Sequence, residues 1–223
     1  MNFLSHYYFE RYSPHSERIL GALLPDLLKN VHKEYNFHPQ RHEEILFAHP
    51  STRHISEGWY RHVEVDRLFH NAPFFLDHCH VLRKELEPIL THLPIRASFM
   101  AHIAVELLLD HLLIVHSLVN PVRLYEHLGQ VKASQIRLYL SVLGIDATEF
   151  LEFYEKFIAS RYILDYAQIE NIAYALFNIC KRVWIFSIED GDYEKLTDCL
   201  TRYRDKELGG FRKIFYDIQD NLT

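Results

Sequence analysis

The stretch Ser98–Leu118, SFMAHIAVELLLDHLLIVHSL, decides the fold class of this chain. Ser98 is a candidate N-cap and Asn120-Pro121 is a stop signal, so the stretch predicts an α-helix. Apolar residues occupy nearly its whole circumference, which is typical of a helix buried among other helices. The chain is therefore expected to be built from packed helices.

Ionisable side chains interrupt this apolar helix. His102, Glu106 and Asp110 recur every four residues and so share one side of the helix, and His111 follows directly. Burying such groups costs free energy unless they are paired, hydrogen-bonded or bound to a metal. Partners are therefore expected elsewhere in the chain.

Composition favours a soluble helical domain. The 223 residues include only 7 Gly and 8 Pro, a balance that favours helices over a turn-rich β architecture. The net charge of -6 argues against nucleic-acid binding, and the charges within Ser98–Leu118 make it a poor membrane span. The three cysteines lie far apart with no CxxC pattern and no secretory signal is visible, which predicts a cytoplasmic protein.

Periodicity predicts helices along the rest of the chain. The opening Met1–Tyr8 is apolar and aromatic, and it is expected to pack on the core and to bring His6 with it. Pro50-Ser51-Thr52 predicts a turn, and no strand alternation or repeat is found. Further helices are predicted over residues 17–29, 39–48, 56–71, 74–87, 122–129, 132–143, 147–161, 168–188 and 192–206, with a short terminal one. The prediction is an all-α, single-domain bundle over residues 1–223.

Ionisable groups in apolar settings occur on three predicted helices. They are Asp26, then His62 with Asp66, then Asp110 with His111. Mixed imidazole and carboxylate ligands suit Mn, Fe, Zn or Mg rather than a thiolate-bound structural zinc. A metal held by separate helices with one open position would activate a water molecule for hydrolysis. Candidates to orient such ligands are His6, Glu106 and His116.

For several other histidines a simpler role than metal binding is expected. His102 pairs with Glu106 one turn later, and His70 lies near a helix end. The residues Asp77–His80 are expected on a solvated face, and the group from His32 to His54 in an exposed loop. Other hydrolase and metal motifs are absent: Glu-x-x-His, His-Glu-x-x-His, the P-loop, the Rossmann glycines and Gly-x-Ser-x-Gly.

Four short motifs in the first 120 residues resemble one family when taken together and in order. They are Met1-Asn-Phe-Leu-Ser-His6, Gly21-Ala-Leu-Leu-Pro-Asp26, Gly58-Trp-Tyr-Arg-His62-Val-Glu-Val-Asp66, and Asp110-His111 followed by His116. This set is similar to the acyl carrier protein phosphodiesterases, which belong with the helical HD-type metal-dependent phosphohydrolases. Residues 121–223 add little to this resemblance beyond being predicted as helical.

The resemblance implies a hydrolase that releases 4'-phosphopantetheine from holo-acyl carrier protein, with a link to fatty acid biosynthesis. It implies a divalent metal, commonly manganese, and acyl carrier protein as the partner. Asp26, His62, Asp66, Asp110 and His111 would form the metal and water-activating centre, with Asp110, His111 and Asp66 as catalytic groups. Candidate basic contacts for the acidic partner are Arg11, Arg18, Lys29 and Lys33.

The chain also departs from the pattern of that family. Ala22 stands where an Asn is favoured, Val63 where an Arg is usual, and His70-Asn71 where Thr-Asp is usual. A lost Arg removes a bidentate phosphate donor. Two alternatives therefore stay open: a catalytically inactive helical interaction protein of the same fold, or a hydrolase of another phosphodiester or nucleotide.

Overall fold

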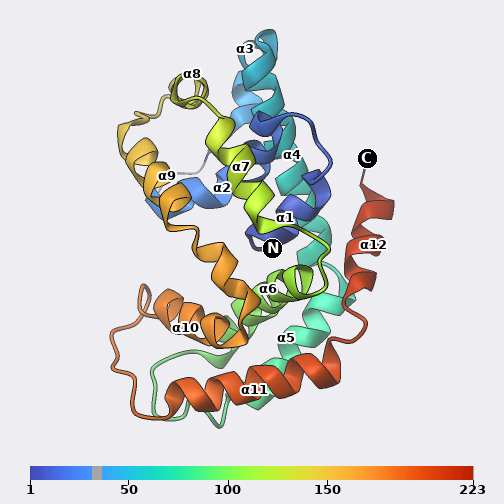
Figure 1. The fold of residues 1–223 in the computed structure, drawn as a ribbon, viewed down its shortest axis with the longest axis vertical. Coiled ribbons are helices and arrows are strands. Elements are labelled where there is room, and N and C mark those ends of the chain that lie inside the picture. The colour runs from blue at the N-terminus through green and yellow to red at the C-terminus, as the bar shows by residue number, and fades with distance from the viewer. Residues whose placement is uncertain (32–36, 223) are drawn as a thin grey trace. The chain divides into compact units, whose positions relative to one another are not determined.

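Every regular element in the described part of the chain is a helix. The computed structural model describes residues 1–31 and 37–222, and it confirms the all-α prediction (Figure 1). The helices are α1 (Phe3–Glu10), α2 (Ser16–Val31), α3 (Glu43–Ala48), α4 (Pro50–His70), α5 (Pro73–Leu86), α6 (Ala97–Val115), α7 (Pro121–Gln130), α8 (Ala133–Val142), α9 (Thr148–Ser160), α10 (Ile169–Cys180), α11 (Asp192–Glu207) and α12 (Arg212–Asn221), with the 3-10 helices η1 (Pro39–His42) and η2 (Tyr162–Ala167).

Four local predictions were wrong. The expected exposed loop from His32 to His54 contains η1, α3 and the start of α4 in its described part, from residue 37 onward, while residues 32–36 lie outside the described residues. Pro50 is the first residue of α4 instead of part of a turn, because proline at the first helical position loses no helix hydrogen bond. The N-cap of α6 is Arg96, with no side-chain cap, so Ser98 lies inside the helix. Helix α10 ends at Cys180 instead of near residue 188, because the following run is β-branched and aromatic and its Trp184 packs edge-on against Phe99.

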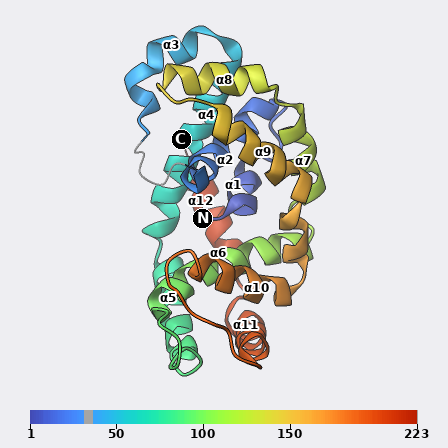
Figure 2. The same cartoon turned by 90° about the vertical axis from the view of Figure 1, so that its left-hand side faces the viewer.

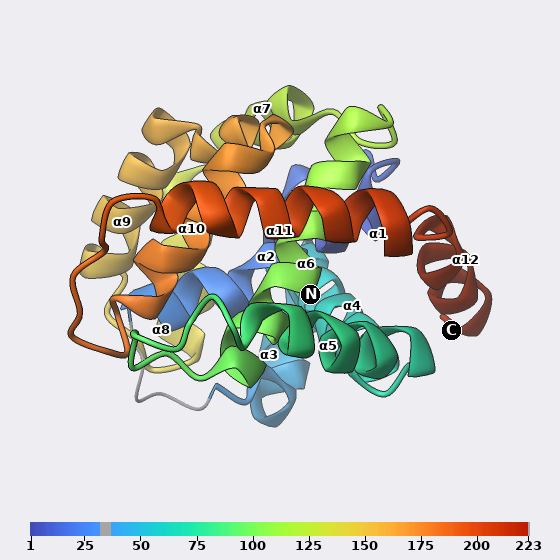
Figure 3. The same ribbon diagram turned by 90° about the horizontal axis from the view of Figure 1, so that it is seen from below.

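The described residues form two compact units. The first contains Met1–Ser5, Asp66–Leu118 and the chain from Asp165 onward, and the second contains the described parts of His6–Val65 and Val119–Leu164. In the first unit α6 packs against α5 and α10, and α11 packs against the same two helices (Figure 3). In the second unit α2 packs against α7 and α9, and α3 lies beside α8 (Figure 2). One domain over residues 1–223 and an HD-like arrangement stay predictions.

Helix α6 is the core helix of the first unit. Its buried residues occur all round the helix, as its composition predicted: Met100, Ala101, Ala104, Val105 and every residue from Leu107 to Leu113. Of the described helices, α6 alone has the length and apolar character to cross a membrane. Its 61% burial within the protein and its buried Asp110 and His111 identify it as a core helix.

The opening segment also packs as predicted. Met1, Phe3 and Leu4 are buried in the first unit, and Tyr7 and Tyr8 are buried in the second. Each of these side chains removes a large apolar area from water, which stabilises α1 despite its short length.

Two glycines allow α2 and α4 to touch through their backbones. A Cβ on Gly58 would stand 2.7 Å from the backbone nitrogen of Ala22, and a Cβ on Gly21 would stand 2.9 Å from the carbonyl carbon of Ile55. Real Cβ atoms do not approach backbone this closely, so only glycine fits at either position. The contact brings the residues that follow, Asp26 on α2 and His62 on α4, near each other.

Candidate functional site

His62 lies at the centre of the ionisable group in the second unit. Its side chain is buried, and its Nδ1 lies 2.8 Å from the carbonyl oxygen of Ala22. A carbonyl oxygen only accepts hydrogen bonds, so Nδ1 donates and the Nε2 of a neutral ring carries the lone pair. That Nε2 lies 3.9 Å from Oδ1 of Asp26. The pair therefore presents one imidazole nitrogen and one carboxylate oxygen to the same point.

His6 stacks on His62 in the same unit. The two ring centroids lie 3.8 Å apart with an interplanar angle of 16°, and both rings are buried. The stacking limits rotation of the His62 ring, as does its hydrogen bond to Ala22. The structure thus brings together three of the residues that the sequence singled out: His6, Asp26 and His62.

Asp66 follows His62 by one turn of α4. Residues four apart share one face of a helix, so α4 directs both side chains to the same side. Oδ1 of Asp66 also lies 2.6 Å from the amine of Met1, in the first unit. This carboxylate is therefore already neutralised by a cation.

Asp110 accepts hydrogen bonds from the start of α1. It is fully buried, and its two carboxylate oxygens accept four hydrogen bonds from Asn2, Leu4 and Ser5. Two of the donors are the backbone N–H groups of Leu4 and Ser5, which belong to the first turn of α1 and have no partner within the helix. Asp110 therefore caps α1 from a distance.

Burial raises the pKa of Asp110 to about 6, while the hydrogen bonds from Ser5 and Leu4 act in the opposite direction. Four donors face its two oxygens, which is the pattern of a carboxylate, and these donors occupy the lone pairs that a metal would need. Its role as a metal ligand stays a prediction.

His111 uses both ring nitrogens for hydrogen bonds in the first unit. Nδ1 lies 2.9 Å from the carbonyl oxygen of Tyr166, so it donates, and Nε2 accepts from the guanidinium of Arg204 at 3.2 Å. Consecutive helical residues point in different directions, so Asp110 contacts the start of α1 while His111 contacts η2 and α11. Its predicted metal role would require breaking the bond to Arg204.

His111 should make stability depend on pH. Burial lowers the pKa of His111, the Tyr166 carbonyl opposes this change, and Arg204 adds to it. The unfolded chain therefore binds a proton below about pH 6.5 that folded His111 does not bind, and stability falls as pH falls. In urea unfolding between pH 7.5 and 5.5 we expect wild type to lose more stability than His111→Asn, by at most about 1.4 kcal/mol for this one proton. Equal losses would contradict this.

Glu106 and His116 complete the predicted set. Glu106 contacts His102 at 3.2 Å, which confirms that pairing, and it also contacts His70 at 3.1 Å. Burial opposes its ionisation, but the bonds from both histidines and the Met1 amine hold the pKa of Glu106 below its usual range. His116 lies at the exposed end of α6, where its ring packs on Phe211.

Three contacts of the candidate residues were not predicted from the sequence: His111 with Tyr166, His111 with Arg204, and Glu106 with His70. Tyr166 and Arg204 are distant from His111 in the chain, and no spacing signal connects them to it. His70 lies at the end of α4, and its position four residues after Asp66 and eight after His62 places it on the same face of the helix. That spacing was the only available sign that His70 belongs with Glu106.

The comparison with family models extends the resemblance beyond the first 120 residues. The model for acyl carrier protein phosphodiesterase matches residues 1–218. No curated protein sequence and no solved structure matches the chain. The match includes the helical remainder after residue 120 as well as the four motifs. The chain therefore belongs to the acyl carrier protein phosphodiesterase family.

Proposed function

We propose that the protein is a metal-dependent phosphodiesterase that releases 4'-phosphopantetheine from holo-acyl carrier protein. The observation that carries the proposal is the arrangement of His62, with Nδ1 tied to the Ala22 carbonyl and Nε2 3.9 Å from the Asp26 carboxylate. A metal-binding histidine usually donates its other N–H to a carbonyl or carboxylate in this way. Membership of the family supports the substrate.

The donor set suits a hard or borderline divalent ion. Asp26 and His62 would hold it from α2 and α4, and Asp66 is the next residue on the same face of α4. Imidazole and carboxylate donors suit manganese, as the family resemblance implies, and also iron, zinc or magnesium. Asp110 and His111 would contribute only by releasing their present hydrogen bonds.

The bound ion would lower the pKa of a coordinated water and stabilise charge on the phosphoryl oxygens. The chain's own contribution is orientation. The Ala22 carbonyl keeps the proton on Nδ1 of His62, so Nε2 faces Asp26 as a lone pair, and the His6 ring holds the His62 ring in plane. Burial of His6 and His62 keeps bulk water away from this side of the site.

Lys29 is the best placed basic residue for an acidic carrier protein. Its side chain is 67% exposed, and its Nζ lies 3.9 Å from Oδ1 of Asp26, one turn earlier on α2. Arg18 is paired with Glu10 and Glu57, and Arg11 stacks on Tyr8 and Tyr12. Lys33 lies outside the described residues. The cytoplasmic location and the link to fatty acid biosynthesis belong to the same proposal.

A second candidate is a non-catalytic interaction protein of the same fold, which the fully hydrogen-bonded Asp110 and His111 favour. Against it, Val63 is 52% exposed, so the loss of an arginine there changes a solvent-facing position and leaves the His62–Asp26 pair intact. A hydrolase of another phosphodiester or nucleotide would use the same residues.

Holo-acyl carrier protein and Mn²⁺ provide the direct test. We expect wild type to release 4'-phosphopantetheine and His62→Ala to lose at least about 100-fold in rate, because a ligand and its orienting contact are both removed. His80→Ala, which changes an exposed histidine on α5, is the matched control. No release by wild type with Mn²⁺, Fe²⁺, Zn²⁺ or Mg²⁺, or full activity of His62→Ala, would overturn the proposal.

A further inference from the structure

A second group of metal-ligand side chains lies in the first unit, separate from His62 and Asp26. It consists of His70 at the end of α4 and of His102 and Glu106 on successive turns of α6. We propose that this His70–His102–Glu106 cluster is a binding site for a divalent transition ion of the zinc class. The inference does not depend on the proposed function.

The distances within the cluster match the spacing of ligands around one ion. Nε2 of His70 lies 3.1 Å from Oε1 of Glu106, and Nε2 of His102 lies 3.2 Å from the same oxygen. Zinc bonds to nitrogen and oxygen of about 2.0–2.1 Å at tetrahedral angles place neighbouring ligand atoms about 3.3 Å apart. All three ligand atoms lie within 4.8 Å of one another. Small side-chain adjustments would therefore accommodate an ion.

The His70 ring is already oriented for such a site. Its Nδ1 lies 2.9 Å from the backbone carbonyl oxygen of Asp66, which only accepts, so Nδ1 donates. Its Nε2 points at the Glu106 carboxylate, which also only accepts, so in the metal-free protein Nε2 donates a proton whose place an ion would take. A backbone carbonyl in this position is the usual partner of a metal-binding histidine. Phe75 packs edge-on against the His70 and His102 rings, at centroid distances of 5.1 and 4.9 Å, and limits the rotation of both.

The charges around the cluster favour a cation. Glu106 is a carboxylate with only 14% of its side chain exposed. The Met1 amine lies 3.5 Å from it, but this cation lies closer to Asp66, at 2.6 Å. An ion would take the place of the proton on Nε2 of His70; with the imidazoles then neutral, the two carboxylates and one amine leave a net charge of about −1, which attracts the ion.

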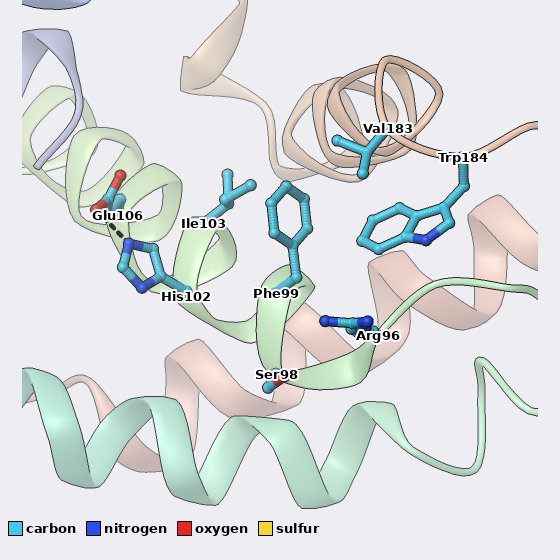
Figure 4. A pocket seen from close by; sticks show the side chains of 8 residues that line it. All are labelled: Arg96, Ser98, Phe99, His102, Ile103, Glu106, Val183 and Trp184. Atoms are coloured by element: carbon cyan, nitrogen blue, oxygen red, sulfur yellow. Dashed lines mark ion pairs between the residues drawn. The ribbon is translucent and has the colours of Figure 1, made fainter. Parts of the chain in front are cut away.

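A cavity gives the cluster an open side. The cavity has a volume of about 730 Å³, a size typical of ligand sites, and its walls include Phe99, Ile103 and Trp184. Figure 4 shows His102 and Glu106 at one end of it and Arg96 with Trp184 at the other. Three protein ligands with access to a cavity are the pattern of an ion that keeps an exchangeable position.

The ligand types decide between metals. Two imidazoles and one carboxylate suit Zn²⁺, Fe²⁺ or Co²⁺, whereas Mg²⁺ and Ca²⁺ prefer oxygen ligands throughout. The site should therefore bind Co²⁺ as a coloured substitute for Zn²⁺ and should bind Mg²⁺ far more weakly.

Titration of metal-free protein with Co²⁺, followed by visible absorption, tests the inference. The experiment uses the Asp26→Ala/His62→Ala variant as the background protein. This variant lacks the proposed catalytic ligands, so Co²⁺ binding to it reports on the His70–His102–Glu106 cluster whether or not the proposed function is correct. We expect one Co²⁺ per chain in this background, displaced by Zn²⁺. Adding His70→Ala and His102→Ala should weaken binding at least about 100-fold, because two of three ligands are lost. Adding His80→Ala instead should leave it unchanged.

Glu106→Gln provides a second, nearly isosteric variant in case the histidine substitutions prevent folding. It should abolish the Co²⁺ spectrum, and Zn²⁺ should no longer raise the melting temperature as it does in the background protein. Absence of Co²⁺ binding by the background protein would overturn the inference. So would tight binding that survives both Glu106→Gln and the double histidine substitution.

Discussion

Asp110→Asn is expected to destabilise the protein by about 3 kcal/mol or more. The carboxylate accepts four hydrogen bonds, two at each oxygen, from Asn2, Leu4 and Ser5. An asparagine has one oxygen and one NH2 group, so its NH2 group must face two donors whichever way the amide is turned. Two buried donors then lose their acceptor, and the first turn of α1 loses a cap that its own sequence does not supply.

Urea unfolding at pH 7, followed by circular dichroism, measures this loss. Asp77→Asn is the matched control, because Asp77 is exposed on α5 and the substitution removes the same charge. That control should stay within about 0.5 kcal/mol of wild type. An Asp110→Asn protein that is as stable as the control but loses bound metal would show that Asp110 is a ligand and not a cap.

Gly58→Ala is expected to have an effect of similar size, about 3 kcal/mol of destabilisation. The added methyl group would meet the carbonyl oxygen of Arg18 and the backbone nitrogen of Ala22, both part of the α2 main chain. A flexible side chain can rotate away from a clash, but a helix backbone cannot, so α2 and α4 must separate. Because Ala22 also accepts the hydrogen bond from His62, the separation should reduce activity as well as stability.

Gly129→Ala is the internal control for the glycine prediction. Gly129 lies in α7, and no atom would be within 4 Å of its added Cβ. Alanine is the better helix former, so this variant should be more stable than wild type by about 0.5–1 kcal/mol. Equal effects of Gly58→Ala and Gly129→Ala in thermal and urea unfolding would contradict the close contact of α2 and α4.

Helix positions were largely predictable because they depend on local pattern. The apolar periodicity of residues such as Leu23, Leu27 and Leu28 predicts a buried face without reference to the rest of the chain. The end of α10 was not predictable in this way. Residues 181–188 are apolar enough to continue the helix, and the packing of Trp184 on Phe99 is a contact between distant segments.

The candidate site was predictable as a set of residues but not as a set of contacts. Spacing on one helix put His62 with Asp66, and the ordered motifs added Asp26 and His6. Neighbours in the chain were misleading for Asp110 and His111. They are adjacent in the sequence, yet one accepts hydrogen bonds from the start of α1 and the other bonds Tyr166 and Arg204.

The sequence by itself determined that this protein is helical, that Ser98–Leu118 forms a buried helix, and which family the chain belongs to. These properties follow from periodicity and from short motifs, which are local. Only the tertiary structure decided what each ionisable group contacts, because a side chain's partners come from other helices whose approach depends on packing. The stretch between Ser98 and Leu118 therefore has two roles. Asp110 caps α1, and His102 and Glu106 are candidate metal ligands.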